Sequence, residues 1–126
     1  MRTILLVEDD PLQALVRKSI LEKRFPDVKR VADAAEALCL IEQRVFSENL
    51  GLVISGHHAH GLSGPAFVAE LHSRLPEVPV LVLGSAAESA RDYTSQGVRF
   101  LAKPVATEEI VAAAREMVLK DARPTA

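Results

Sequence analysis

The sequence predicts a single α/β domain built on a doubly wound, five-stranded parallel sheet. Five short apolar runs alternate along the chain with segments of helical periodicity, and this alternation is typical of repeated strand–helix units. The 126 residues, 48% of them hydrophobic, suffice for one core and are too few for a second domain. We therefore expect a (βα)5 domain over residues 1–121, followed by a C-terminal tail over 122–126.

The apolar runs that we assign to strands are residues 4–7, 28–32, 52–55, 78–83 and 98–102. Three of the five are almost wholly apolar, which favours strands buried on both faces of a parallel sheet. The run VKRVA at 28–32 differs, because its charges are typical of a strand with one wetter side or at the edge of the sheet.

The first helix has the clearest start signal. Asp10 supplies an N-cap and Pro11 a first-turn proline, directly after the first strand. One face of this helix then carries Leu12, Leu15, Val16 and Ile20. That spacing is the pattern of an amphipathic helix with its apolar face on the core.

The other helices follow the remaining strands. Asp33 begins the second with a capping-box pattern, Ser63 begins the third, and Thr107 begins the last. The fourth, over 86–96, is shorter and more polar, and it ends at Gly97.

Composition argues against several classes of protein. Fifteen basic and seventeen acidic residues give a net charge of -2, so we expect no binding to nucleic acid or to a membrane. No apolar stretch reaches the length of a membrane span, and the N-terminus lacks a signal-peptide pattern. Cys39 is the single cysteine and has apolar neighbours, which predicts a buried, inert thiol in a cytoplasmic protein.

Unusual residues follow three of the strands. Glu8 to Asp10 follow the first strand, Ser55 to His58 end the third, and Lys103 follows the fifth. In an open parallel sheet the carboxyl ends of the strands form the working edge. Carboxylates with a lysine opposite can hold a divalent cation and a phosphoryl group, so we expect the chemistry at this edge.

Four segments carry a resemblance to a known family: ILLVEDDPLQALVR, GLVISGHHAHGLSG, VPVLVLGSA and GVRFLAKP. They resemble successive signature segments of the receiver domain of bacterial two-component response regulators, over nearly the whole chain. The resemblance implies a flavodoxin-like fold of the CheY-like type. It also implies that an aspartate after the third strand accepts a phosphoryl group, aided by an acidic pair, a magnesium ion, a hydroxyl side chain and a lysine.

Three residues match the family's assisting groups. Glu8 and Asp9 match the acidic pair, with Asp9 as the metal ligand, and Lys103 matches the phosphate-pairing lysine. Without a third carboxylate the three carry a charge of about -1, so we expect at most weak Mg²⁺ binding and no other cofactor. An alternative interpretation is a salt-bridged polar cluster that closes the edge of the sheet.

The reactive positions are the ones that depart from the family. Matching the glycines of the loop after the third strand places Gly56 where the family has its phosphoaccepting aspartate. Gly84 stands at the hydroxyl position, although its neighbour Ser85 could partly substitute. Glycine has no side-chain oxygen, so an acyl phosphate cannot form at residue 56. No Asp or Glu occurs between Glu48 and Glu70, which argues against another register.

The loop histidines leave two alternatives open. His57, His58 and His60 could form a transition-metal site, since imidazole is a common ligand, and this would suit a small metal-dependent enzyme. His57 could instead be a surrogate phosphoacceptor in an otherwise conventional phosphorelay receiver.

The resemblance also marks a partner surface, made by the fourth helix, the fifth strand and the fifth helix. Phe100, Tyr93 and Arg115 belong to it, and a homodimer through this surface is possible. Our hypothesis is a pseudo-receiver, a signalling module that acts through protein contact without aspartyl phosphorylation and is not an enzyme.

Overall fold

The computed structural model describes residues 2–56, 58–59, 62–84, 93 and 97–119, and an open parallel sheet forms its centre. The five strands lie in the order β2-β1-β3-β6-β7. Their bounds are Thr3–Val7 (β1), Val28–Val31 (β2), Leu50–Gly56 (β3), Val80–Gly84 (β6) and Val98–Ala102 (β7). The predicted five-stranded α/β fold is confirmed, and the charged strand β2 lies at an edge of the sheet.

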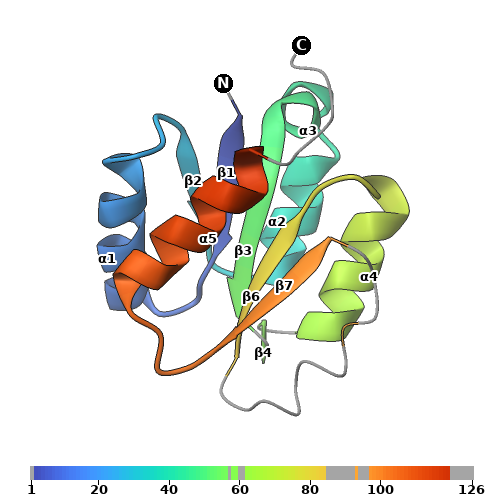
Figure 1. Cartoon of the computed structure of the whole chain (residues 1–126). Coiled ribbons are helices and arrows are strands. Elements are labelled where there is room, and N and C mark those ends of the chain that lie inside the picture. The colour runs from blue at the N-terminus through green and yellow to red at the C-terminus, as the bar shows by residue number, and fades with distance from the viewer. Residues whose placement is uncertain (1, 57, 60–61, 85–92, 94–96, 120–126) are drawn as a thin grey trace.

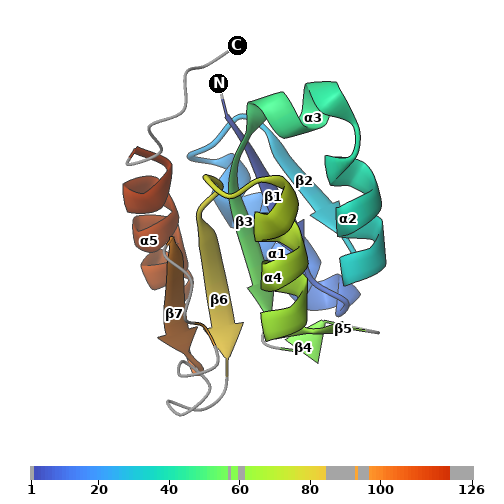
Figure 2. The same ribbon diagram turned by 90° about the vertical axis from the view of Figure 1, so that its right-hand side faces the viewer.

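Helices cover both faces of the sheet, as Figures 1 and 2 show. On one face α1 (Pro11–Glu22) and α5 (Thr107–Leu119) lie side by side. On the other lie α2 (Ala34–Ile41), α3 (Arg44–Asn49) and α4 (Gly64–Arg74). All five strands run in the same direction, so their carboxyl ends meet at one edge of the sheet.

The core has two halves because successive residues of a strand point to opposite faces. The half beneath α2 and α4 includes Leu5, Val53, Val80, Val82, Phe67 and Leu71. The half beneath α1 and α5 includes Ile4, Leu6, Ile54, Leu81, Leu21 and Ala114. Burial on both faces explains why the central strands are continuous apolar runs in the sequence.

Helix α1 packs with a different face from the one its apolar stripe suggests. Leu12, Leu15 and Val16 are 70%, 63% and 47% exposed, whereas Ala14 and Leu21 are buried. The inward face carries Ala14, Arg17 and Leu21, at helical spacings of three and four residues. The prediction that the leucine stripe lies on the core was wrong, because spacing alone does not show which of two neighbouring stripes meets the sheet.

Cys39 is exposed, so the prediction of a buried thiol was also wrong. Helix α2 buries Ala34, Ala37 and Ile41. These positions define its inward face, and Cys39, two residues beyond Ala37, points away from it. Apolar neighbours in sequence therefore did not indicate burial.

The predicted caps are confirmed for three helices. The side chains of Asp10, Asp33 and Ser63 accept hydrogen bonds from backbone N–H groups in the first turns of α1, α2 and α4.

Helix α3 was not predicted, nor was the antiparallel pair β4 (His58–Ala59) and β5 (Leu62–Ser63). Of the helix expected over 86–96 the structure describes only Tyr93, which lies outside any helix.

None of the helices within the described ranges is long and apolar enough to cross a membrane.

Candidate functional site

The register of the sheet places Glu8 and Gly56 at the ends of neighbouring strands. Val7, the last residue of β1, pairs with Ser55 of β3. Glu8 and Gly56 are the next residues of the two chains, so both lie at the carboxyl edge of the sheet. The sequence argument that these positions share one edge is thus supported by the register.

The next two strands bring Gly84 and Lys103 to the same edge. Gly56 pairs with Leu83 of β6, and Gly84 pairs with Ala102 of β7. The carbonyl oxygen of Gly84 accepts a hydrogen bond from the N–H of Lys103, 2.5 Å away. Glu8, Gly56, Gly84 and Lys103 therefore follow one another along the edge in the spatial order β1, β3, β6, β7.

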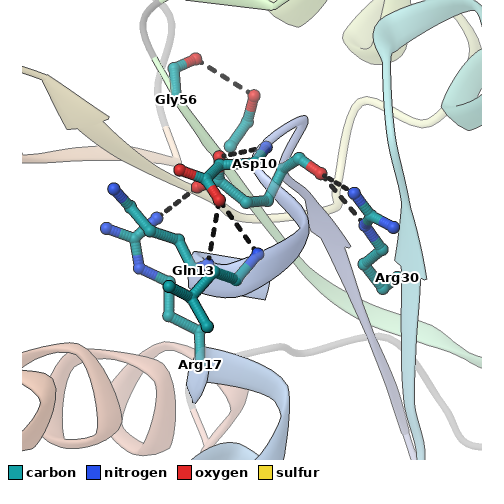
Figure 3. A network of polar contacts seen from close by, with 8 residues as sticks. Asp10, Gln13, Arg17, Arg30 and Gly56 are labelled. Atoms are coloured by element: carbon teal, nitrogen blue, oxygen red, sulfur yellow. Dashed lines mark hydrogen bonds and ion pairs between the residues drawn. The ribbon is translucent and has the colours of Figure 1, made fainter. Parts of the chain in front are cut away.

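The carboxylate of Glu8 is engaged through both of its oxygens. Oε1 accepts a hydrogen bond from Nη1 of Arg17 within an ion pair, and Oε2 accepts one from the N–H of Asp10 at 3.1 Å. The side chains of Arg17 and Glu8 are only 14% and 13% exposed. Figure 3 shows Arg17 rising from α1 toward the turn that contains Asp10. Solvent screens such a pair less than it screens an exposed one.

The main chain of Glu8 is also fixed. Its N–H donates to the carbonyl oxygen of Val31 at 3.0 Å. Its own carbonyl oxygen accepts two hydrogen bonds from Arg30 of β2, from Nε at 3.0 Å and from Nη2 at 2.7 Å (Figure 3). Guanidinium groups from two different elements thus meet at Glu8, one at its side chain and one at its backbone.

The two aspartates that follow Glu8 differ in what the structure shows of them. Asp10 is the N-cap of α1, and its Oδ1 accepts from the N–H groups of Leu12 at 2.9 Å and Gln13 at 3.3 Å, as Figure 3 shows. Asp9 lies between Glu8 and this cap and is exposed. Its predicted role as a metal ligand stays a prediction.

At the end of β3 the chain offers backbone groups and one hydroxyl. Ser55 is 1% exposed, and its hydroxyl donates to the carbonyl oxygen of Gly56 at 3.1 Å. Gly56 itself is half-buried and has no side chain. Among the residues that the structure describes, no three His, Cys, Asp or Glu side chains are grouped so that they could hold a metal ion.

Several predicted positions lie outside the described residues. They are Ser85, His57 and His60, and the side chain of His58 is not described either. The histidine metal site and the surrogate phosphoacceptor at His57 therefore stay predictions.

Lys103 is exposed and lines an open groove beside α1. Leu12, Val16 and Arg17 form the α1 side of this groove, and the chain after β7, beginning with Lys103 and Pro104, forms the other side. The Lys103–Pro104 peptide bond is cis. The alternative interpretation from the sequence was a salt-bridged cluster of Glu8, Asp9 and Lys103. Within the described ranges the cation that pairs with Glu8 is Arg17 and not Lys103.

Two of the three residues of the predicted partner surface contact each other. Tyr93 and Phe100 pack against each other, with ring centroids 6.1 Å apart, on the half of the core beneath α2 and α4. Arg115 is exposed on α5 and lines a second groove, between α1 and α5. The expected homodimer surface includes residues 86–96, most of which lie outside the described ranges, so it stays a prediction.

Comparison with known families decides the class of protein. The response regulator receiver domain family matches residues 4–115, which is most of the chain. The chain belongs to this family. No curated protein shows a significant match in sequence to this receiver domain.

Solved receiver domains share the fold at low sequence identity. A receiver domain from Clostridium thermocellum is 20% identical with a TM-score of 0.85, covering 95% of this chain and 96% of that one. The signal receiver domain of an HD domain-containing protein from Pseudomonas fluorescens Pf-5 is 26% identical with a TM-score of 0.80, over 95% and 96% of the two chains. The signal receiver domain of a signal transduction histidine kinase from Syntrophus aciditrophicus is 24% identical with a TM-score of 0.83, over 98% and 95%.

As a receiver domain, the chain is a two-component signalling module that works with protein partners. Sequence reasoning found the carboxyl edge and its acidic residues but missed Arg17. An arginine nine residues after a glutamate, within a helix, looks like any surface cation. Its place on the Ala14 and Leu21 face of α1 is known only from the structure.

Proposed function

We propose that this receiver domain signals through protein contact without aspartyl phosphorylation. The observation that supports the proposal most directly is Gly56, the last residue of β3, at the carboxyl edge beside Glu8. Family resemblance assigns the phosphoacceptor to this position. A glycine there provides no oxygen that could be phosphorylated.

The surrounding chain supplies no replacement carboxylate. Between Glu48 and Glu70 the sequence contains neither aspartate nor glutamate. Ser55 is nearby, but its hydroxyl is buried and donates to the carbonyl oxygen of Gly56. Formation of an acyl phosphate needs a carboxylate. The residues at this site therefore favour a function that uses the fold for binding and does not include phosphoryl transfer.

An exposed apolar face supports action by contact. Leu12, Leu15 and Val16 project from α1 into solvent, although large apolar side chains are usually buried. Two of them line the groove that also contains Lys103. Exposed apolar residues bordered by polar ones are typical of surfaces that bind proteins.

The proposal is tested by incubating the protein with a small phosphodonor and Mg²⁺ and then measuring its intact mass. We expect the mass to stay unchanged, because residue 56 cannot form the acyl phosphate. A stable gain of one phosphoryl group in the wild type would refute the proposal. Loss of that gain in a His57→Ala variant would then identify His57 as a surrogate acceptor.

A further inference from the structure

Glu8, which follows β1, already has a cation of its own. In this family the corresponding acidic pair is expected to bind Mg²⁺, which prefers several oxygen ligands in octahedral geometry. In this chain Oε1 of Glu8 accepts from Arg17 and Oε2 accepts from Asp10. A dication at Glu8 would have to share these oxygens with the two donors or displace one of them, and it would lie next to the positive charge of Arg17.

The contact between Arg17 and Glu8 is set by the orientation of α1. Arg17 lies on the inward face of α1 between Ala14 and Leu21 and is 14% exposed. The same orientation of the helix leaves Leu12 and Leu15 exposed to solvent. Full burial of a leucine contributes roughly 1.5–3 kcal/mol, but a rotation that buried Leu12 and Leu15 would expose Ala14 and Leu21. The observed orientation instead places the guanidinium at Glu8.

Among the described residues, the charges on and around Glu8 balance without a metal. Glu8, Asp9 and Asp10 contribute three negative charges. Arg17 and Arg30 both contact Glu8, and Lys103 lines the same groove as Arg17, so three positive charges accompany them. A bound dication would leave an excess of positive charge next to the Glu8–Arg17 pair, whose two side chains are only 13% and 14% exposed, and this low exposure makes the excess unfavourable.

We infer that the guanidinium of Arg17 is a resident cation that takes the place of Mg²⁺ at Glu8. The residues present therefore do not fit the magnesium ion that the family implies. The inference rests on the proposed function only in locating the site at Glu8 and Gly56. It further implies that adding the missing carboxylate by Gly56→Asp does not by itself create a Mg²⁺ site, because Arg17 still occupies Glu8.

The test compares Mg²⁺ binding by isothermal titration calorimetry in Gly56→Asp and in the double variant Gly56→Asp with Arg17→Met. Methionine keeps an apolar stem for packing but removes the charge. We expect the double variant to bind Mg²⁺ at least about tenfold more tightly than Gly56→Asp, because removing a nearby positive charge favours a dication.

The matched control is Gly56→Asp with Lys18→Met. Lys18 is the next residue on α1, and its substitution by methionine removes one positive charge, as Arg17→Met does. Lys18 pairs with Glu22 and not with Glu8, so the charge at Glu8 is left in place. We expect its Mg²⁺ affinity to equal that of Gly56→Asp. Equal affinities in the Arg17 and Lys18 double variants would overturn the inference, as would tight Mg²⁺ binding by Gly56→Asp alone.

A second measurement decides the question if the Arg17→Met chains do not fold. Saturable Mg²⁺ binding raises the melting temperature of a folded protein. We expect MgCl2 to leave the melting temperatures of the wild type and Gly56→Asp unchanged beyond the effect of matched ionic strength, and a specific rise in either would contradict a resident Arg17. The absence of phosphorylation is tested separately by the mass of the wild type, so the two ideas can fail independently.

Discussion

Arg17 of α1 and Glu8 at the end of β1 form a partly buried ion pair. The pair forms on the face of α1 that also buries Ala14 and Leu21. Replacing Arg17 with methionine leaves the carboxylate of Glu8 with one donor instead of two. We expect a loss of about 1.5–3 kcal/mol in the free energy of unfolding, the range for a hydrogen bond to a charged group. Urea denaturation followed by far-UV circular dichroism measures it.

Lys18→Met is the control for that measurement. Lys18 pairs with Glu22 on the helix surface, with the two side chains 37% and 45% exposed. Exposed pairs of this spacing contribute about 0.3–0.5 kcal/mol. Similar losses in the two variants would show that the Arg17–Glu8 pair contributes no more to the free energy of unfolding than an exposed surface pair.

The orientation of α1 predicts opposite outcomes for two leucines of the same helix. Leu21 is 1% exposed and Leu15 is 63% exposed. Leu21→Ala should lower the free energy of unfolding by about 2–5 kcal/mol, as expected for a core leucine. Leu15→Ala should change it by less than about 0.5 kcal/mol, as is usual at the surface. A large loss for Leu15→Ala would mean that the helix packs with its leucine stripe inward.

Gly51 is required by a close approach between β3 and the N-terminus. It is the extra residue where the pairing of β3 with β1 shifts, and a Cβ at this position would lie 2.4 Å from the Cβ of Arg2. Gly51→Ala should destabilise the fold by about 1–3 kcal/mol through overpacking. Adding Arg2→Gly should recover most of the loss, because it removes the opposing atom. The same loss in both backgrounds, measured by thermal unfolding, would rule out this contact as the cause.

The N-cap of α1 also stabilises the turn that contains Glu8. Asp10 accepts hydrogen bonds from Leu12 and Gln13, so Asp10→Ala should cost about 1 kcal/mol of stability. Asp10→Asn keeps a capping oxygen and should retain most of it. If alanine and asparagine prove equivalent in chemical denaturation, the cap does not contribute as described.

The sheet could be predicted from the sequence because its strands are buried on both faces. A run such as the one around Leu81 has no polar position to confuse the pattern, and the charges of β2 indicated an edge. Caps such as Asp10 and Asp33 were predictable because they depend on neighbours a few residues away.

Properties that depend on helix orientation could not be predicted in the same way. Leu12 and Leu15 are exposed, and Cys39 is exposed among apolar neighbours, because the inward faces of α1 and α2 are set by contacts with the sheet. The pairing of Arg17 with Glu8 depends on that same orientation, so no local pattern reveals it. The phosphoacceptor position was assigned to Gly56 by matching the loop glycines to the family, and in the structure Gly56 is the last residue of β3.

The most direct test of the account is the intact mass of the wild-type chain after exposure to a small phosphodonor and Mg²⁺. With a glycine at the end of β3, we predict that the spectrum contains only the unmodified chain. A stoichiometric species heavier by one phosphoryl group would contradict the central claim that this receiver domain acts without covalent phosphorylation.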